Sequence, residues 1–304
     1  MIASIDKADM PADIENSQVT ASVVVFRTSP DELSALLECF RLSTYKAQLL
    51  VVDNSPSDEL KSVVKTSGVA EYLWLRKNIG FGAAHNIAIR ELQQRGRYHM
   101  IVNPDILFGS TVIERLVRFM DGHPDVGQTM PRVEYPDGTE QRLCKQLPTP
   151  VDLLLRRFVD KRLFSRRRDR YELRDVNLQV ARVVPFLSGC FMFLRTAILQ
   201  TVGGFDERFF MYMEDTDLCR RINRVAQTVF VPQVLVAHGY AMGSYHSSKL
   251  LYYHLKSGAQ YFNKWGWLFD SERGRLNCAA RLQSSILDVS MTPRLVRDER
   301  AHDN

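Results

Sequence analysis

Apolar runs alternate with stretches of helical periodicity over the first third of the chain, and this alternation limits the fold more than any other feature. Strands are predicted at residues 19–26, 48–54, 71–76 and 98–105, with helices between them at 29–40, 57–65 and 83–95. The run LLVV within the second strand is typical of a strand that is covered on both faces. The order βαβαβαβ predicts an α/β fold with a mostly parallel sheet, helices on both faces, and ligands at the carboxyl ends of the strands.

The first predicted helix carries local start signals. Ser29 can cap the helix, Pro30 suits its first turn, and Glu32 completes a capping box with Ser29. One face of the helix carries the apolar residues Leu33, Leu36, Leu37 and Phe40. This spacing predicts a helix that packs one apolar face on the sheet.

The composition is that of a globular protein, with 45% hydrophobic and 25% charged residues among 304. No apolar run approaches the roughly 20 residues that span a bilayer. Residues 1–18 lack the basic-then-apolar order of a secretory signal, so we expect a cytoplasmic protein. The five cysteines are odd in number and widely spaced, without a C-x-x-C pair, and they predict neither a disulfide framework nor a zinc site.

The formal net charge of +5 is unevenly distributed, because residues 156–170 alone carry +6. Apolar residues interleave with these cations, namely Leu155, Phe158, Val159, Leu163 and Phe164. This pattern is typical of an amphipathic helix on an anionic membrane surface, with Arg166, Arg167 and Arg168 as docking candidates. A solvated basic face explains the pattern as well. Nucleic acid is not expected, because no reading module accompanies the basic stretch.

Polar residues fall where the predicted strands end. Asp53 and Asn54 close the second strand, where a carboxylate can accept from a nucleotide base or ribose, or can simply cap a turn. Gly80 lies in the loop before a helix, where glycine lets backbone amides approach a phosphate, although a tight loop needs glycine too. Asn103 and Asp105 follow the fourth strand, where a carboxylate can bind Mg²⁺ or Mn²⁺.

Three carboxylates, Glu214, Asp215 and Asp217, directly follow an aromatic and methionine run. Acids beside an apolar wall are usually paired, bound to metal or tuned for proton transfer, because an unpaired buried carboxylate is costly. Arg220 and Arg221 lie three and four positions after Asp217 on a predicted helix. Glu214 and Asp217 are therefore expected to serve as helix-terminus or ion-pair residues.

Taken together, these segments resemble glycosyltransferase family 2, the inverting nucleotide-sugar enzymes with a GT-A fold. The resemblance rests on VVDNS, N-x-G-F-G, NPD and LSGCFMFLRTAILQTVGGFDERFFMYMEDTDLCRRI in that order, over roughly residues 20 to 245. The rhamnosyltransferase-like bacterial branch is the most similar. The combination is specific, although each piece is common by itself.

The resemblance implies roles for residues that hold the donor. Asp53 is expected to contact the nucleotide base, with Asn54 beside it. Asn78 and Gly80 are expected near the donor, and Gly204 is expected to let the backbone turn under the donor sugar.

The resemblance also implies a metal site and a catalytic base. Asp105 takes the last place of a metal-binding D-x-D motif, whereas Asn103 departs from the motif and lowers its negative charge. His238 matches a histidine that ligates the metal or contacts diphosphate, or it is a structural histidine. Asp215 resembles the base that takes the proton of the acceptor hydroxyl, beside a wall that includes Phe209.

The expected organisation follows the same motifs. The predicted parts are an N-terminal extension at 1–18, a catalytic domain at 19–245 with a nucleotide half at 19–108, an acceptor half at 109–245 and a basic insertion at 152–175, and a C-terminal helical region with a mobile tail at 246–304. A helix is predicted through the run that ends at Phe269, where it covers the acceptor side or touches the membrane. Periodicity is weak from Arg273 onward.

The predicted function is transfer of L-rhamnose from dTDP-L-rhamnose onto a glycan or a lipid-linked saccharide in bacterial cell-surface polysaccharide synthesis. Mg²⁺ or Mn²⁺ is the expected cofactor, and the cytoplasmic face of the cell membrane is the expected location. A UDP-sugar donor, carrying galactofuranose, N-acetylglucosamine or glucose, remains an alternative. A sugar nucleotidyltransferase is less favoured, because FRTSPDE follows the first strand in place of a glycine-rich basic loop. A non-catalytic saccharide-binding module is also less favoured, given Asp105 and Asp215.

Overall fold

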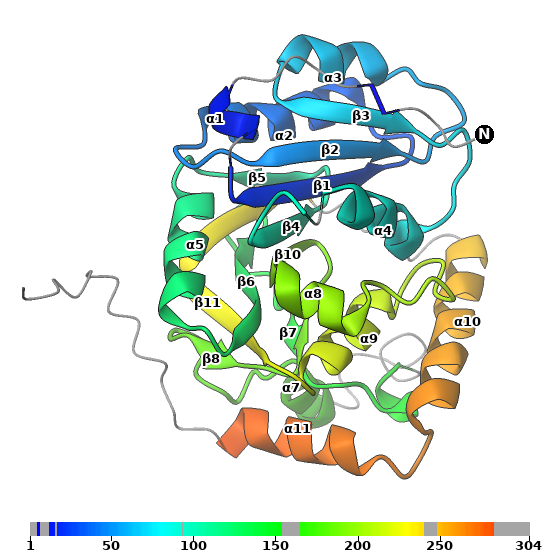
Figure 1. Cartoon of the computed structure of the whole chain (residues 1–304). Helices are drawn as coiled ribbons and strands as arrows, with labels where there is room; N and C mark the ends of the chain where they lie inside the picture. The colour runs from blue at the N-terminus through cyan, green and yellow to red at the C-terminus, as the bar shows by residue number, and fades with distance from the viewer. Residues whose placement is uncertain are drawn as a thin grey trace, which may run out of the picture.

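A computed structural model describes residues 5–6, 12–15, 17–92, 94–153, 165–239 and 248–282. Across these ranges the strands form a nine-stranded sheet, with helices on its faces and at its lower end (Figure 1). The strand order is β3-β2-β1-β4-β10-β6-β11-β5, with β8 paired to β11. A separate two-stranded sheet joins β7 to β9. The predicted GT-A-like α/β fold is therefore confirmed.

The first half of the sheet is parallel, as the alternation of apolar runs predicts. Its strands and helices are β1 (Val19–Val25), α2 (Pro30–Leu42), β2 (Gln48–Asp53), α3 (Lys61–Ser67), β3 (Ala70–Trp74), α4 (Phe81–Leu92) and β4 (Tyr98–Val102), preceded by α1 (Ala12–Glu15). Strand β1 pairs in parallel with both β2 and β4, and β2 pairs in parallel with β3. Every residue of β2 is buried, which confirms a strand covered on both faces.

The second half of the sheet is mixed. It contains β5 (Ile106–Phe108), α5 (Val112–Gly122), β6 (Val126–Glu134), β7 (Cys144–Lys145), α7 (Ser165–Tyr171), β8 (Arg182–Val183), β9 (Phe186–Leu187), β10 (Phe191–Arg195), α8 (Thr196–Val202), α9 (Glu214–Ile222) and β11 (Gln227–His238). Strand β10 runs antiparallel to β4 and β6, and β5 runs antiparallel to β11. Strand β10 begins beside the carboxyl end of β4, because Phe191 pairs with Val102. The residues just before β10 therefore lie at the edge where β1, β2 and β4 end.

The structure shows the predicted start of helix α2 at Ser29 and Pro30. The Ser29 hydroxyl oxygen accepts from the Glu32 backbone N–H at 3.2 Å, and Pro30 occupies the first turn. All four predicted apolar residues are buried in the main core cluster. Burial of a leucine of this kind stabilises the fold by about 1.5–3 kcal/mol relative to an exposed side chain.

Several boundaries differ from the sequence prediction, such as the start of α3 (Lys61–Ser67) at residue 61 instead of 57, and two of the differences have a clear local cause. The fourth strand ends at Val102 instead of residue 105, because Asn103 and Pro104 begin a turn in which the Ile106 N–H donates to the Asn103 carbonyl at 3.2 Å. The C-terminal helix α10 (Ser248–Trp265) ends four residues earlier than predicted. Gly266, with φ of +102°, stops it with the left-handed residue that commonly terminates helices.

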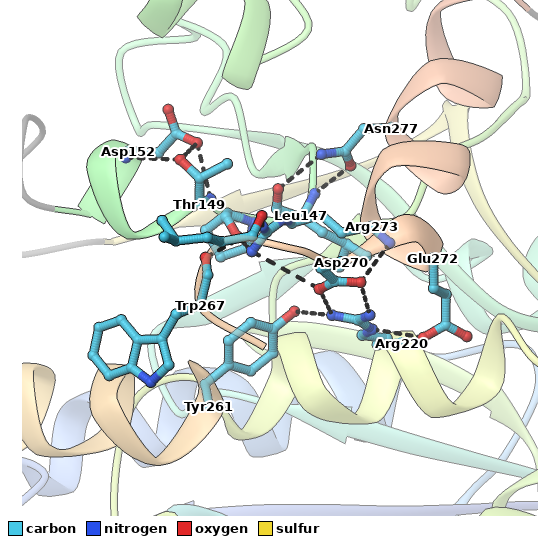
Figure 2. Close-up of polar contacts among 12 residues, drawn as sticks. Leu147, Thr149, Asp152, Arg220, Tyr261, Trp267, Asp270, Glu272, Arg273 and Asn277 are labelled. Atoms are coloured by element: carbon cyan, nitrogen blue, oxygen red, sulfur yellow. Dashed lines mark hydrogen bonds and ion pairs between the residues drawn. The ribbon is translucent and has the colours of Figure 1, made fainter. Parts of the chain in front are cut away.

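Helix α11 (Ser271–Leu282) corrects the expectation of an irregular chain from Arg273 onward. Asp270 caps it, because the Asp270 carboxylate accepts from the Arg273 N–H at 2.9 Å. Asn277 holds the helix to the loop at 147 through two hydrogen bonds with Leu147, at 2.7 and 2.9 Å (Figure 2). Polar tertiary contacts, which weak periodicity cannot indicate, therefore support this helix. The predicted mobile tail beyond residue 282 lies outside the described residues.

No helix of the described ranges is long and apolar enough to cross a bilayer.

Candidate active site

The carboxyl ends of the parallel strands bring the predicted donor residues to one edge of the sheet. Asp53 ends β2, where it is level with Val25 of β1 and Trp74 of β3. Its carboxylate is fully buried and accepts from the Ser55 N–H and the Tyr72 hydroxyl, each at 2.7 Å. Burial, followed by the bond to Asp53, raises the pKa of Tyr72, so the hydroxyl stays a donor. Asp53 thus acts as a turn cap in this structure, and its contact with a nucleotide base stays a prediction.

Asn54 and Asn78 hold the loop that leads into α4. The Asn54 side chain donates to the Gly80 carbonyl at 3.2 Å and accepts from the Ile79 N–H at 3.4 Å. The Asn78 side chain accepts from the Gly80 N–H at 2.9 Å. Both asparagines therefore bind the backbone of the loop before α4, which fixes the shape of the predicted phosphate-binding segment.

Gly80 is required by the approach of two loops. Its φ is +96°, and a Cβ at this position would lie 2.4 Å from the Phe210 carbonyl oxygen. The same carbonyl accepts from the Phe81 N–H at 3.0 Å. Glycine thus lets the loop before α4 hydrogen-bond to the segment that precedes Asp215.

Asn86, which the sequence analysis did not single out, holds the loop around Gly204. Its side chain donates to the Phe205 carbonyl at 2.9 Å and accepts from the Phe205 N–H at 2.8 Å. A Cβ on Gly204 would lie 2.6 Å from the Asn86 amide oxygen. Gly204 has a φ of +72° and leaves room for Asn86, and its place under the donor sugar stays a prediction. A buried asparagine on the apolar face of a predicted helix is the signal that could have found it.

Backbone strain gathers around this edge. Among the described residues, five non-glycine residues have positive φ, and four of them, Arg27, Arg76, Tyr212 and Met213, border the site. Such strain concentrates at functional sites in proteins. Both arginines are exposed, and the Arg76 guanidinium lies 4.7 Å from the ring centroid of Trp74. They add positive charge beside the strand ends.

Asp215 lies in the first turn of α9, partly exposed to solvent. One carboxylate oxygen accepts from the Gly189 N–H at 3.0 Å, and the other accepts from the Thr216 N–H at 2.7 Å. Burial raises the pKa of Asp215, while these amide donors and the charge of Lys145 act in the opposite direction. The arrangement gives an oriented carboxylate that is more basic than an aspartate in water.

Glu214 and Asp217 have different surroundings from Asp215. Glu214 is buried, and its Oε2 has no hydrogen-bond partner among the described residues. Burial and then the charge of Asp215 raise the pKa of Glu214 well above its ordinary value. Asp217 is fully buried and bonds Arg221 at 2.8 Å, Lys264 at 2.6 Å and the Trp265 indole at 2.8 Å.

Asp217 is an ion-pair residue, as expected, and of the two arginines that follow it on α9 it pairs with Arg221. The Arg220 guanidinium instead bonds Asp270 at 2.5 Å and Glu272 at 2.9 Å (Figure 2). Helix α9 directs Arg220 toward the C-terminal helices, whereas Arg221 lies one full turn after Asp217 and reaches it.

The aromatic wall before Asp215 is only partly available to a ligand. Phe209 is 1% exposed and packs with Met213, Tyr261 and Phe262, so it belongs to the core. Phe210 is partly exposed and stacks on Tyr253 of α10 with ring centroids 4.6 Å apart. Phe209 was predicted to form part of an aromatic wall beside Asp215, because the sequence does not show that α10 packs over this segment.

Asp105 and His238 come together at the ends of β4 and β11. The His238 Nε2 lies 3.1 Å from an Asp105 carboxylate oxygen. The Gln141 amide nitrogen donates to the His238 carbonyl at 3.0 Å, so the Gln141 amide oxygen faces the His238 Nδ1 at 2.9 Å as an acceptor. The acceptor at Nδ1 places a proton on that nitrogen, and Nε2 is the ring atom that faces Asp105.

This geometry fits a divalent cation. Neighbouring ligands of an octahedral ion with metal–oxygen distances of about 2.1 Å lie about 3 Å apart, which agrees with the separation of Nε2 and the carboxylate oxygen. Within the described ranges, no three His, Cys, Asp or Glu side chains form a metal cluster. Asn103 is partly exposed on the turn before Asp105, and its backbone N–H donates to the Cys190 carbonyl at 2.9 Å. The protein thus offers two ligands, and a bound diphosphate can supply others.

The basic candidates on α7 are partly engaged within the protein. The Arg167 guanidinium bonds the Asp152 carboxylate at 2.6 Å and the Thr149 hydroxyl at 2.8 Å. Arg166 is exposed, and Arg168 is partly exposed. The interleaved apolar residues at 155–164 lie outside the described residues, so the predicted amphipathic helix stays a prediction.

Comparison with known proteins agrees with this arrangement. The model of the family described as Glycosyl transferase family 2 matches residues 22–203. An N-acetylglucosaminyl-diphospho-decaprenol L-rhamnosyltransferase of Mycobacterium tuberculosis is 28% identical over 71% of this chain and 75% of its own length. The rhamnosyltransferase WbbL of Escherichia coli K12 is 24% identical over 79% of this chain and 90% of its own length.

Solved structures share the fold at low identity. Residues 1–349 of TarS from S. aureus superpose with a TM-score of 0.51 at 16% identity over 73% of this chain, which spans 60% of that structure. The mannosyltransferase PcManGT of Pyrobaculum calidifontis, in complex with GDP-Man and Mn²⁺, gives a TM-score of 0.53 at 16% identity. That match covers 92% of this chain and 80% of the other.

Proposed function

Because the chain belongs to glycosyltransferase family 2, we propose that it transfers L-rhamnose from dTDP-L-rhamnose to a lipid-linked saccharide, with inversion at the sugar carbon. The two relatives are rhamnosyltransferases, which supports the donor, and the mycobacterial relative acts on a decaprenyl-linked N-acetylglucosamine, which supports an acceptor carried on a polyprenyl diphosphate. The reaction belongs to the assembly of bacterial cell-surface polysaccharide. The observation that carries the proposal is the oriented, partly exposed carboxylate of Asp215 beside the ends of the parallel strands.

In this proposal Asp215 accepts the proton of the acceptor hydroxyl as the hydroxyl oxygen attacks the sugar carbon. The bond to the nucleoside diphosphate breaks on the opposite face, and one base is enough for such a single displacement. The raised pKa of Asp215 favours proton acceptance. The Gly189 and Thr216 amides hold both carboxylate oxygens in place.

Asp105 and His238 hold Mg²⁺ or Mn²⁺ in this proposal, with Gln141 keeping the His238 Nε2 available. When bound, such an ion neutralises charge on the leaving diphosphate. Asn103 in place of a carboxylate lowers the negative charge of the site, so we expect weaker metal binding than a D-x-D pair would give. The Pyrobaculum mannosyltransferase binds Mn²⁺ together with its nucleotide sugar, which supports the choice of metal.

Membrane contact at the cytoplasmic face through the basic stretch is a further part of the proposal. A basic residue near anionic lipid gains about 1 kcal/mol, and the gain is screened over about 10 Å at 0.1 M salt. Replacing Arg166, Arg167 and Arg168 by Ser should weaken binding to anionic vesicles and transfer to a lipid-linked acceptor, with transfer to a short soluble acceptor preserved. Equal loss of both transfers would reject this role.

The test of the proposed function is a transfer assay with a panel of donors. Purified protein is incubated with dTDP-L-rhamnose, UDP-N-acetylglucosamine, UDP-galactofuranose or UDP-glucose, together with a polyprenyl-diphosphate-linked N-acetylglucosamine, with Mn²⁺ or with excess EDTA. We expect rhamnosyl product only with the first donor, inverted anomeric configuration by NMR, and loss of product in EDTA. Product from a UDP-sugar alone would reject the rhamnose assignment, and full activity in EDTA would reject the metal site.

A further inference from the structure

Three consecutive large apolar side chains project from the connection between α10 and α11. Trp267 is 47% exposed, Leu268 is 77% exposed and Phe269 is 96% exposed. Phe269 is the most exposed large hydrophobic side chain among the described residues. Single exposed apolar residues are ordinary on protein surfaces, but three adjacent ones at a projecting turn indicate contact with an apolar partner.

A left-handed glycine and hydrogen bonds from inside the protein fix the shape of this connection. Gly266 adopts φ of +102°, and its N–H donates to the Phe262 carbonyl at 2.8 Å. The Arg273 guanidinium donates to the carbonyls of Trp267 and Leu268, at 3.4 and 3.3 Å (Figure 2). These two carbonyls thus have donors inside the protein, which reduces the cost of moving this irregular backbone from water toward lipid.

A buried charged cluster anchors the far end of the connection. Asp270 and Arg220 have side chains that are each 2% exposed, and they form two hydrogen bonds at 2.5 and 2.7 Å. The Trp265 ring covers the Arg220 guanidinium at 4.2 Å. A buried ion pair is weak evidence for stability, because desolvation offsets the attraction. Its geometric effect is to fix the position of Asp270, which directly follows Phe269.

The outer face of α10 adds two further exposed apolar side chains and positive charge. Tyr252 is 59% exposed and Leu255 is 47% exposed, and Lys249 and Lys256 are exposed on the same side. Spacings of three, four and seven residues place these side chains on one face of a helix. Figure 1 shows α10 at the side of the molecule, with its connection to α11 at a corner.

The inner face of α10 packs on the segment that carries the catalytic carboxylate. Tyr253 stacks on Phe210, and the Ser257 hydroxyl donates to the Met211 carbonyl at 2.7 Å. Since a helix with its side chains is about 10–12 Å thick, anything bound on the outer face of α10 lies about one helix thickness from the segment before Asp215.

We propose that Tyr252, Leu255, Trp267, Leu268 and Phe269, here called the apolar ridge, insert into the interface of an anionic lipid bilayer. The inference deepens the proposed function, on which it rests for its purpose, because a bilayer on this face brings a lipid-linked acceptor beside the Asp215 segment. Tryptophan and tyrosine favour the membrane interface, and the flanking lysines complement anionic headgroups. A side chain that is 96% exposed meets almost none of its own protein, so the ridge fits a deformable surface better than a preformed groove.

The test is vesicle cosedimentation of the full chain, without donor or acceptor. Leu268→Ser with Phe269→Ser should weaken binding to phosphatidylcholine–phosphatidylglycerol vesicles at least tenfold. The matched control, Leu42→Ser with Leu107→Ser, removes exposed apolar side chains elsewhere and should bind as the wild type does. Both double variants should keep the wild-type unfolding temperature, since the four side chains are exposed. Vesicles should also shift the tryptophan emission of the wild type to the blue, and Trp267→Phe should abolish that shift.

Several outcomes would overturn the inference. Wild-type vesicle binding by the ridge variant would do so, as would equal loss in the control variant. If the wild type is a dimer by light scattering and the ridge variant a monomer, the ridge is a self-association surface instead. Because the assay needs no sugar donor, a failure of rhamnose transfer leaves this result unchanged, and the two proposals fail separately.

Discussion

Replacing Asp215 by Asn removes the proposed proton acceptor while keeping its size. A general base contributes about 10²–10⁴-fold to a rate, which corresponds to about 2.7–5.4 kcal/mol in the activation free energy. We therefore expect kcat to fall within this range. The KM for the nucleotide sugar should change little, because the loss falls on the transition state.

The structure also sets the cost of this change for the fold. Both oxygens of Asp215 accept from backbone N–H groups, so the Asn amide nitrogen must face either Gly189 or Thr216 as a second donor. An unmet backbone donor costs about 1–3 kcal/mol. Removal of a carboxylate whose pKa burial raises offsets part of that cost. We expect the unfolding temperature of the variant to fall by only a few degrees.

The assay is the pH dependence of kcat/KM for wild type and variant, with thermal unfolding measured in parallel. The wild-type rate should rise with pH through the raised pKa of Asp215, because only the ionised carboxylate accepts a proton. Asp215→Asn should lose this rise. Glu214→Gln is the matched control on the same turn and should keep it. If Asp215→Asn retained more than a tenth of wild-type kcat with the same acid limb, the base would have to be another group.

Three further predictions concern the loop, the buried acid and the metal site. Gly80→Ala should destabilise the fold by about 3 kcal/mol or more in denaturant unfolding, since it adds an overlap to the strain of φ +96°. Gly138→Ala is its control, with φ of +81° and nothing within 4 Å of the added Cβ, and should cost only about 1–2 kcal/mol. Glu214→Gln should gain stability relative to wild type as pH rises above 4.5. The unfolded wild type loses this proton first, so its folded state is penalised over that window, and a constant difference in melts between pH 4.5 and 8 would contradict the reasoning. Gln141→Ala should weaken Mn²⁺ binding about 10–100-fold in a titration followed by EPR, and unchanged affinity would show that Gln141 does not position His238.

Local signals explain what could be predicted about the fold. The parallel half follows from runs of adjacent apolar residues, and α2 follows from Ser29 and its apolar face, because these signals act over only a few residues. Asp217 with Arg221 is a contact of the same range. Asp105 was a metal candidate from its place after the fourth strand, His238 came from the resemblance, and the structure brings them within 3.1 Å.

The contacts that the sequence did not predict join residues that are far apart in the chain. Arg220 pairs with Asp270, fifty residues later, in preference to Asp217 on its own helix. Gln141 reaches His238 across 97 residues, and nothing near Gln141 in the sequence indicates that contact. Phe209 is buried because α10 packs over it. Its aromatic character suggested a wall beside a ligand, but the side chain belongs to the core.

Helix α10 supports the turn that carries Asp215, the proposed base. Lys264 and the Trp265 indole both bond Asp217, whose carboxylate has no exposed surface and lies two residues after Asp215. Together with Arg221 these contacts compensate the buried charge of Asp217, since a buried carboxylate needs paired and hydrogen-bonded partners. The Ser257 hydroxyl fixes the Met211 carbonyl in the same segment. The position of Asp215, the proposed base, therefore depends on α10 as well as on the sheet, and a bilayer bound as proposed to the outer face of α10 would contact this supporting helix.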